Sequence, residues 1–160
     1  MEDPTRAADP DRALKLAYAY LNRRERTEAE VRRHLEARGI EPAAAGEAIA
    51  TLREQGYLDD VRFARLFAED KRHLDQWGSE RIRRTLTERG LDRELVDETL
   101  RHTPPEDERE RARTLLRRRF PSVPLDPRDR DRALGVLLRK GFDSDLAIEV
   151  IASHARDALA

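Results

Sequence analysis

The sequence predicts an all-α protein built as three tandem three-helix repeats in an elongated, curved array, and three observations support this. Apolar residues recur at helical spacing along most of the chain. Glycines and prolines stand where such helices would end or begin. The pattern also returns every 51 residues, as at Leu35, Leu86 and Leu137. Self-similarity over three copies is the signature of a helical repeat.

The composition favours thin helical layers over one large globular core. Charged residues make up 41% of the 160 residues and apolar residues 38%, while aromatic residues make up only 5%. With so few large apolar side chains, each helix can bury only a narrow stripe. A three-helix unit therefore buries too little by itself and has to pack against the next one.

Each repeat contains a small or branched apolar residue, a leucine four positions later, and a glycine four positions after that. These triplets are Val31, Leu35 and Gly39; Ile82, Leu86 and Gly90; and Ala133, Leu137 and Gly141. A bulky apolar residue follows each glycine, where it can pack back on the helix end: Ile40, Leu91 and Phe142. The predicted boundaries are a flexible N-terminus at 1–10, units at 11–57, 58–103 and 110–160, and a linker at 104–109.

In the first unit, helical spacing starts at Asp11. Thr27-Glu28-Ala29-Glu30 is a capping box that begins the second helix, which Gly39 ends. Pro42 opens the third helix, because proline is tolerated in a first turn, and Gly56 ends it.

In the second unit, Asp59 and Asp60 begin a helix, and Trp77-Gly78-Ser79 interrupts the chain before the next one. Gly90-Leu91-Asp92 then starts a third helix, which ends before Pro104 and Pro105. The predicted apolar face of the first of these helices consists of Phe63, Ala64, Phe67 and Leu74.

The third unit departs from this plan. Its first helix ends in three arginines, and a longer loop with three prolines, residues 120–127, replaces the shorter connection of the earlier units. Asp126-Pro127 is predicted to begin the next helix, and Asp143 the last one.

The segment Gly56-Tyr57-Leu58-Asp59-Asp60-Val61-Arg62-Phe63-Ala64 predicts a helix end followed at once by a helix start. Gly56 can adopt the left-handed conformation that ends a helix. Asp59 or Asp60 can accept hydrogen bonds from the free amides of the new helix. We expect Tyr57 and Leu58 to pack on its first turn.

This string, followed by Trp77-Gly78 and by the Ile82, Leu86 and Gly90 triplet, resembles the RecX family. The resemblance covers residues 11–155 and is strongest from Leu52 to Leu100. It implies three tandem three-helix repeats, in agreement with the 51-residue offset. The motif residues that it implies to be structural are Gly56, Tyr57, Leu58, Asp59, Asp60, Phe63, Ala64, Trp77, Gly78, Ile82, Leu86 and Gly90.

For function, the resemblance implies a non-enzymatic regulator that lodges in the helical groove of the RecA recombinase filament on DNA. Such a protein restrains strand exchange, ATP turnover and coprotease activity, and so modulates recombination, DNA repair and the SOS response. We therefore expect the RecA filament to be the partner, with DNA phosphates secondary. The match is weakest in the third unit, which has the longer proline loop and lacks the arginine pair found in the first two units.

The residues themselves give no argument for catalysis, a metal or a cofactor. The four histidines, at 34, 73, 102 and 154, lack the spacing of paired metal ligands, and no phosphate-binding loop or nucleophile elbow occurs. Without cysteine, no disulfide is expected. No apolar run reaches the ~20 residues of a membrane span. We expect a cytoplasmic monomer that does not bind membranes.

Arginine supplies almost all the positive charge of the chain, although the net charge is −1. Of the 32 basic residues only Lys15, Lys71 and Lys140 are lysines, a bias that a GC-rich genome also produces. Arginine suits phosphate and carboxylate recognition better than lysine does. The candidate partner-binding residues are Arg32, Arg33, Arg83, Arg84, Arg117, Arg118 and Arg119.

Two arginine pairs recur at the repeat offset, Arg32-Arg33 and Arg83-Arg84, on the side of the helix away from the buried stripe. In the third unit Leu134 and Gly135 replace the pair. A merely solvated face is the alternative interpretation. A third recurring cation, at Arg38, Arg89 and Lys140, precedes each helix-ending glycine, and we assign it to folding because it offsets the helix dipole.

A second function remains open from the sequence, a DNA-binding helical module that uses its arginine faces without sequence preference. Three-helix units are also common in helix-turn-helix DNA-binding proteins. Salt distinguishes the two functions, because phosphate-driven binding falls steeply with ionic strength.

Overall fold

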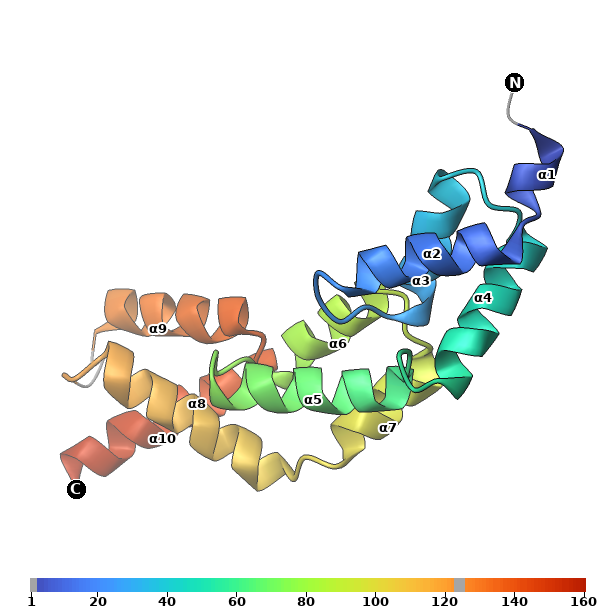
Figure 1. Ribbon diagram of the computed structural model, residues 1–160. Helices are drawn as coiled ribbons and strands as arrows, with labels where there is room; N and C mark the ends of the chain where they lie inside the picture. The colour runs from blue at the N-terminus through green and yellow to red at the C-terminus, as the bar shows by residue number, and fades with distance from the viewer. Residues whose placement is uncertain (1–2, 123–125) are drawn as a thin grey trace. The chain divides into compact units, whose positions relative to one another are not determined.

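The computed structural model describes residues 3–122 and 126–160, and these residues form helices and connecting turns without any strand (Figure 1). The predicted all-α class is confirmed. None of the helices within the described ranges is long and apolar enough to cross a membrane. The helices are α1 (Pro4–Ala7), α2 (Pro10–Leu21), α3 (Glu28–Ala37), α4 (Pro42–Glu54), α5 (Asp60–His73), α6 (Ser79–Glu88), α7 (Arg93–Arg101), α8 (Pro105–Arg119), α9 (Pro127–Lys140) and α10 (Ser144–Leu159).

The chain divides into two compact units by its contacts. One comprises Met1–Arg65 and Thr87–Leu95, and the other Leu66–Leu86 and Val96–Ala160. Helices α2, α3 and α4 pack on one another in the first unit, and α8, α9 and α10 in the second. Helices α5, α6 and α7 contribute residues to both units, and the finer boundaries expected from the sequence stay a prediction.

The repeated leucine is buried in every copy. Leu35, Leu86 and Leu137 are completely buried, as the 51-residue offset predicts. The apolar residue four positions before each leucine, Val31, Ile82 or Ala133, is also completely buried. Because two side chains four residues apart lie on one face of a helix, each middle helix presents the same stripe to its core.

The helix ends follow the predicted glycine pattern. Gly56 has a φ of 80°, its N–H donates to the Arg53 carbonyl at 3.1 Å, and the Tyr57 N–H donates to the Leu52 carbonyl at 2.9 Å. These two bonds satisfy carbonyls that a helix end would otherwise leave unpaired. Positive φ values also occur at the other repeat glycines, Gly39, Gly90 and Gly141. The apolar residues that follow them, Ile40, Leu91 and Phe142, are at most 5% exposed.

The helix starts also match their sequence signals. Thr27 and Glu30 form both hydrogen bonds of a capping box at α3. Pro42 occupies the first turn of α4. Asp126 accepts from the Asp129 N–H at 2.8 Å at the start of α9, and Asp143 accepts from the Leu146 N–H at 3.1 Å at α10.

One local expectation needs correction and another stays a prediction. Residues Pro4–Ala7, within the segment expected to be flexible, form one helical turn, α1, in which Asp3 accepts from the Thr5 N–H at 3.0 Å. Leu74, expected on the buried face of α5, lies just beyond the end of this helix at His73 and is 78% exposed. Met1, Glu2 and residues 123–125 of the proline-containing loop lie outside the described residues.

Candidate interaction surface

The two aspartates at the start of α5 have different tasks. Asp59 caps α5, because its Oδ1 accepts from the Arg62 N–H at 2.9 Å. Asp60 instead accepts from the Glu28 N–H, at 3.0 Å, at the start of α3. The expectation that Asp59 or Asp60 caps α5 is therefore met by Asp59, while Asp60 binds the start of α3. Sequence spacing could not show that Asp60 binds α3, since Asp60 and Glu28 are 32 residues apart.

Leu58 and Tyr57 also separate. Leu58 is 1% exposed, whereas Tyr57 is 59% exposed and contacts Tyr18 edge-on, with ring centroids 5.6 Å apart. Tyr57 also lines a small pocket together with Arg62 and Phe63 at the start of α5, so its packing on that turn stays a prediction. Phe63 and Ala64 are buried as expected of motif residues.

In the first compact unit, the start of α3 lies against the chain that follows α6. The Thr27 hydroxyl donates to the Arg89 carbonyl at 2.7 Å, and the Arg89 guanidinium binds the Glu30 carboxylate through Nε and Nη2. Arg89 also lies over the Phe63 ring, 4.5 Å from its centroid. A Cβ atom at Gly90 would overlap the Ala29 side chain, so the two backbones approach closely here.

The second compact unit repeats this contact one step along the chain. The Gly78 N–H donates to the Lys140 carbonyl at 2.8 Å, and the Glu80 N–H donates to the Gly141 carbonyl at 3.0 Å. A Cβ atom at Gly78 would overlap the backbone of Gly141. Gly78 and Lys140 stand 51 residues after Thr27 and Arg89, so the same interface recurs with different donors.

An acidic side chain from the following repeat also caps each of these middle helices. Asp60 does so for α3, and Glu108 for α6, where its two oxygens accept from the Ser79 N–H at 2.6 Å and hydroxyl at 2.9 Å. The last middle helix, α9, uses its own Asp126. Successive repeats are therefore joined by hydrogen bonds at helix ends as well as by apolar packing.

The carboxyl groups at the first interface have shifted pKa values of opposite sign. Burial raises the pKa of Asp60, and the charge of Glu28 adds to this effect. Burial would also raise the pKa of Glu30, but hydrogen bonds from Thr27 and the positive charge of Arg89 lower it overall. The Asp60 carboxylate is thus held where ionisation is costly, and that of Glu30 where it is favoured.

Trp77 lies at the break between α5 and α6 in a cluster of aromatic and cationic groups. Its ring meets Phe67 edge-on, with centroids 6.1 Å apart, and the Arg81 guanidinium lies 4.0 Å from the Trp77 centroid. Lys71 Nζ is 4.8 Å from the same centroid. The Trp77 carbonyl accepts from Arg111 Nη1 at 3.0 Å. These contacts are those of a packing residue, although a partner-binding role is not tested by them.

The two arginine pairs are exposed, but one member of each has contacts within the chain. Arg83 forms an ion pair with Asp97, and Arg33 Nε makes a long bond, 3.4 Å, to the Ala29 carbonyl. Arg32 and Arg84 form no ion pair within the described residues. Because Arg32 and Arg83 occupy the same repeat position, the pairs differ in which arginine is available.

The three arginines at the end of α8 are all exposed. Arg117 lies 3.6 Å from Glu110, a solvated ion pair, whereas Arg118 and Arg119 form none with the residues that the structure describes. Among the helix-end cations assigned to folding, Arg89 binds Glu30, and Lys140 Nζ donates to the Asp75 carbonyl at 2.9 Å. Arg38 is exposed at the end of α3.

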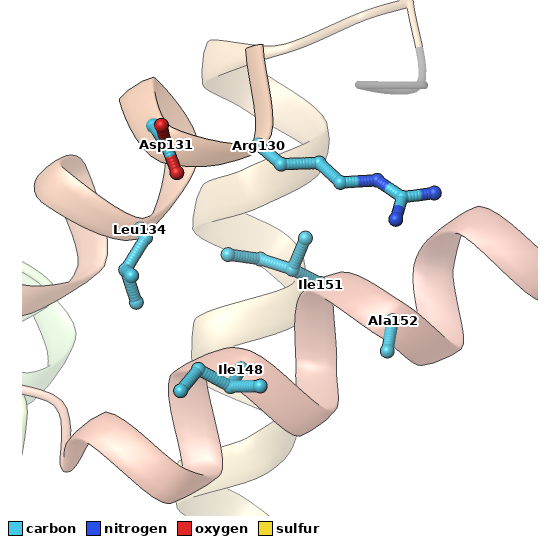
Figure 2. A pocket seen from close by; sticks show the side chains of 6 residues that line it. All are labelled: Arg130, Asp131, Leu134, Ile148, Ile151 and Ala152. Atoms are coloured by element: carbon cyan, nitrogen blue, oxygen red, sulfur yellow. The ribbon is translucent and has the colours of Figure 1, made fainter. Parts of the chain in front are cut away.

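In the third repeat, an apolar pocket of about 170 Å³ takes the place of the polar contact at Arg83. Figure 2 shows Leu134 of α9 and Ile148 and Ile151 of α10 turned toward the same space. Leu134 and Ile148 occupy the repeat positions of Arg83 and Asp97, so an apolar pair replaces the ion pair. No group of acidic or histidine side chains suited to a metal ion occurs in the part of the chain that is described.

Comparison with known proteins decides the family. Residues 13–52, 59–100 and 106–151 match, in that order, the first, second and third three-helix domains of RecX. The chain belongs to the RecX family. The resemblance inferred from the motif and the predicted three-helix repeats are confirmed.

Relatives in this family carry the name regulatory protein RecX. The protein from Deinococcus radiodurans is 39% identical over 136 residues, which are 84% of this chain and 65% of that protein. The chain thus spans slightly less than two thirds of that relative. A relative from Xanthomonas campestris pv. campestris is 40% identical over 133 residues, 82% of this chain and 81% of the relative. The crystal structure of RecX from Lactobacillus salivarius has the same fold, with a TM-score of 0.79 at 21% identity over 91% of this chain and 96% of that one.

Sequence reasoning missed the contacts that join successive RecX repeats. Asp60, Glu108 and the Arg89 guanidinium act on residues between 29 and 59 positions away. The sequence contains an indirect signal, because Thr27 and Gly78 precede their middle helices and stand 51 residues apart. This offset indicates that the two positions are equivalent, but it does not identify the group that accepts the hydrogen bond from each of them.

Proposed function

We propose that this RecX-family chain is a non-enzymatic regulator that binds the RecA filament on DNA and restrains strand exchange, ATP turnover and coprotease activity. The observation that carries the proposal is the presence of all three RecX domains, in order, on one chain. We further propose that it acts as a cytoplasmic monomer. In this function DNA phosphates are secondary contacts.

Exposed arginines support recognition of a charged filament. In a filament groove this chain would meet both polymerised protein and nearby phosphates, and a planar guanidinium can bind a carboxylate or a phosphate with two parallel hydrogen bonds. Arg32 and Arg84 are exposed and make no ion pair within the described chain, so their forks remain available. Arg118 and Arg119 offer the same chemistry on α8.

A DNA-binding module remains the second candidate, and the same exposed arginines favour it. In that case binding would not require the recombinase. Its affinity would fall with salt by about 0.9 log units per phosphate neutralised for each tenfold rise in salt concentration. The net charge of −1 provides no general attraction to DNA and weighs against this candidate.

The decisive experiment titrates the purified protein into a recombinase ATPase assay on single-stranded DNA, beside a binding assay with naked DNA at the same salt. The proposal expects ATP turnover to fall at protein concentrations that leave naked DNA unbound. If inhibition appears only where naked DNA is also saturated, and both effects decline together with salt, the DNA-binding function is the correct one. A protein that leaves ATP turnover unchanged at every concentration refutes the regulator.

A further inference from the structure

Two half-buried arginines of the second compact unit have donors that nothing in the described chain uses. They are Arg72 near the end of α5 and Arg111 in the middle of α8. The Nε and Nη2 atoms of both are buried and lack a hydrogen-bond partner among the described residues. A buried donor of a charged group without an acceptor is costly, and native structures seldom tolerate it without a reason.

The unused atoms form the same edge of the guanidinium in both residues, and elsewhere in this chain that edge holds an oxyanion. Arg53 binds the Glu28 carboxylate through Nε at 2.7 Å and Nη2 at 2.9 Å. Arg89 binds Glu30 through Nε at 3.1 Å and Nη2 at 2.9 Å. Arg72 and Arg111 thus each have a fork that binds no acceptor within the described chain, of the kind that binds carboxylate or phosphate with parallel hydrogen bonds.

Neighbouring acids do not fill these forks. Glu108 is the acid whose charge acts most strongly on both arginines, but its two carboxylate oxygens already accept from Ser79. Arg111 uses its remaining nitrogen, Nη1, on the Trp77 carbonyl. Arg111 reaches the chain beside Arg72, because Trp77, whose carbonyl Arg111 binds, donates its own N–H to the Lys71 carbonyl at 2.9 Å. Burial lowers the pKa of both guanidiniums.

We propose that Arg72 and Arg111 form a binding site for a phosphate-class oxyanion. Two forks offer four directed donors, and a tetrahedral phosphate has enough oxygens to accept from both, whereas a single carboxylate has two. A doubly charged anion also offsets the repulsion between two neighbouring cations. The phosphate is either a free ion or a group of a nucleic-acid backbone.

Calorimetric titration of the full chain with inorganic phosphate, in a buffer free of other oxyanions, tests the site. Sodium chloride at matched ionic strength is the blank. We expect saturable binding of one anion per chain, and an affinity about tenfold lower for Arg72→Lys, which keeps the charge but loses the fork. Arg72 makes no hydrogen bond that this substitution would break, so its fold should be intact by circular dichroism.

Arg53→Lys is the matched control, because its fork is already occupied by Glu28 and it should leave phosphate affinity unchanged. The proposal is overturned if wild type and Arg72→Lys bind phosphate with equal affinity. It is also overturned if phosphate binds no better than the chloride blank and Arg72→Lys leaves the binding of DNA unchanged.

A short single-stranded oligonucleotide identifies the source of the phosphate. If Arg72→Lys weakens oligonucleotide binding, and free phosphate competes with it, the site takes a backbone phosphate. If phosphate binding depends on Arg72 while oligonucleotide binding does not, the ligand is the free ion. If neither phosphate binding nor oligonucleotide binding depends on Arg72, the site is refuted, whatever the outcome of the ATPase assay. The two proposals therefore fail separately.

Discussion

Asp60 and Glu30 flank the same helix start, but their carboxyl groups respond to it in opposite ways. Burial raises the pKa of Asp60. The pKa of Glu30 is lowered overall, because the hydrogen bonds from Thr27 and the charge of Arg89 outweigh the effect of burial. At the residue scale, the interface therefore contains one acid that resists ionisation and one that favours it. Stability should depend on pH with opposite signs at these two positions.

Unfolding by urea at a series of pH values should reveal these signs. As pH falls through the raised pKa of Asp60 toward its ordinary value of 3.8, the native state binds the proton first, so wild type should gain stability relative to Asp60→Asn. Glu30 contributes stability above its ordinary value of 4.5 that is lost as pH falls through its lowered pKa. The advantage of wild type over Glu30→Gln should therefore shrink in acid. Differences of the same sign, or independent of pH, would contradict this assignment.

Helices are held by two kinds of contact, a buried apolar stripe and close backbone approach at helix ends. The stripe is visible in the complete burial of Leu35, Leu86 and Leu137. The close approach is visible at Gly78, where a side chain would overlap Gly141. At this scale the three copies are equivalent in their stripe but not in their end contacts.

Truncation of the repeated leucine tests the stripe. Leu35→Ala, Leu86→Ala and Leu137→Ala should each lower the free energy of unfolding by about 2–5 kcal/mol, because each leaves a cavity in a packed core. Leu74→Ala is the control, since Leu74 is 78% exposed, and should change it by less than about 0.5 kcal/mol. One leucine that behaves like the control would show that its copy is not equivalent.

Adding one methyl group tests the close approach. Gly78→Ala should cost about 1–3 kcal/mol in thermal or urea unfolding, because the new Cβ has no room beside Gly141 unless a backbone moves. Gly46→Ala, inside α4, should instead stabilise by about 0.5–1 kcal/mol, since its Cβ would meet only Arg32 Nη1 at 4.0 Å. A Gly78→Ala protein as stable as wild type would mean that this contact is not tight in solution.

Over the whole molecule, neighbouring repeats complete one another's helix ends where they meet. The C-terminal end of α3 and the N-terminal end of α9 have no neighbouring repeat beside them in the sequence order, and groups of their own repeats complete them. Arg12 Nη2 donates to the Arg38 carbonyl at 3.1 Å at one end, and Asp126 caps α9 at the other. Between these ends, the exposed arginines are the feature that packing does not explain. Their role in partner binding is thus a property to test on the complete chain.

Charge reversal at Arg84 should separate recognition from folding. Arg84→Glu should leave the melting temperature nearly unchanged, since exposed substitutions usually lie within about 0.5 kcal/mol. It should weaken recombinase inhibition by about tenfold or more, roughly 1.4 kcal/mol in binding. Arg65→Glu, an exposed arginine outside the candidate set, is the matched control. Equal inhibition by Arg84→Glu and wild type at matched salt would show that this face is only solvated.

Local chemistry sufficed for the helices and their order, because a helix start, a helix end and a buried stripe each depend on residues within one or two turns. Thr27, Gly56 and Leu35 could therefore be interpreted from the chain alone, and the family motif followed from the same residues. The roles of Asp60, Arg83 and Arg72 could not be interpreted in this way. Whether each has a partner, and which one, depends on helices that are distant in the chain but neighbours in space. Which charges are paired, buried or left with an empty fork follows from packing between helices, and a pattern of spacing within one helix contains no information about that.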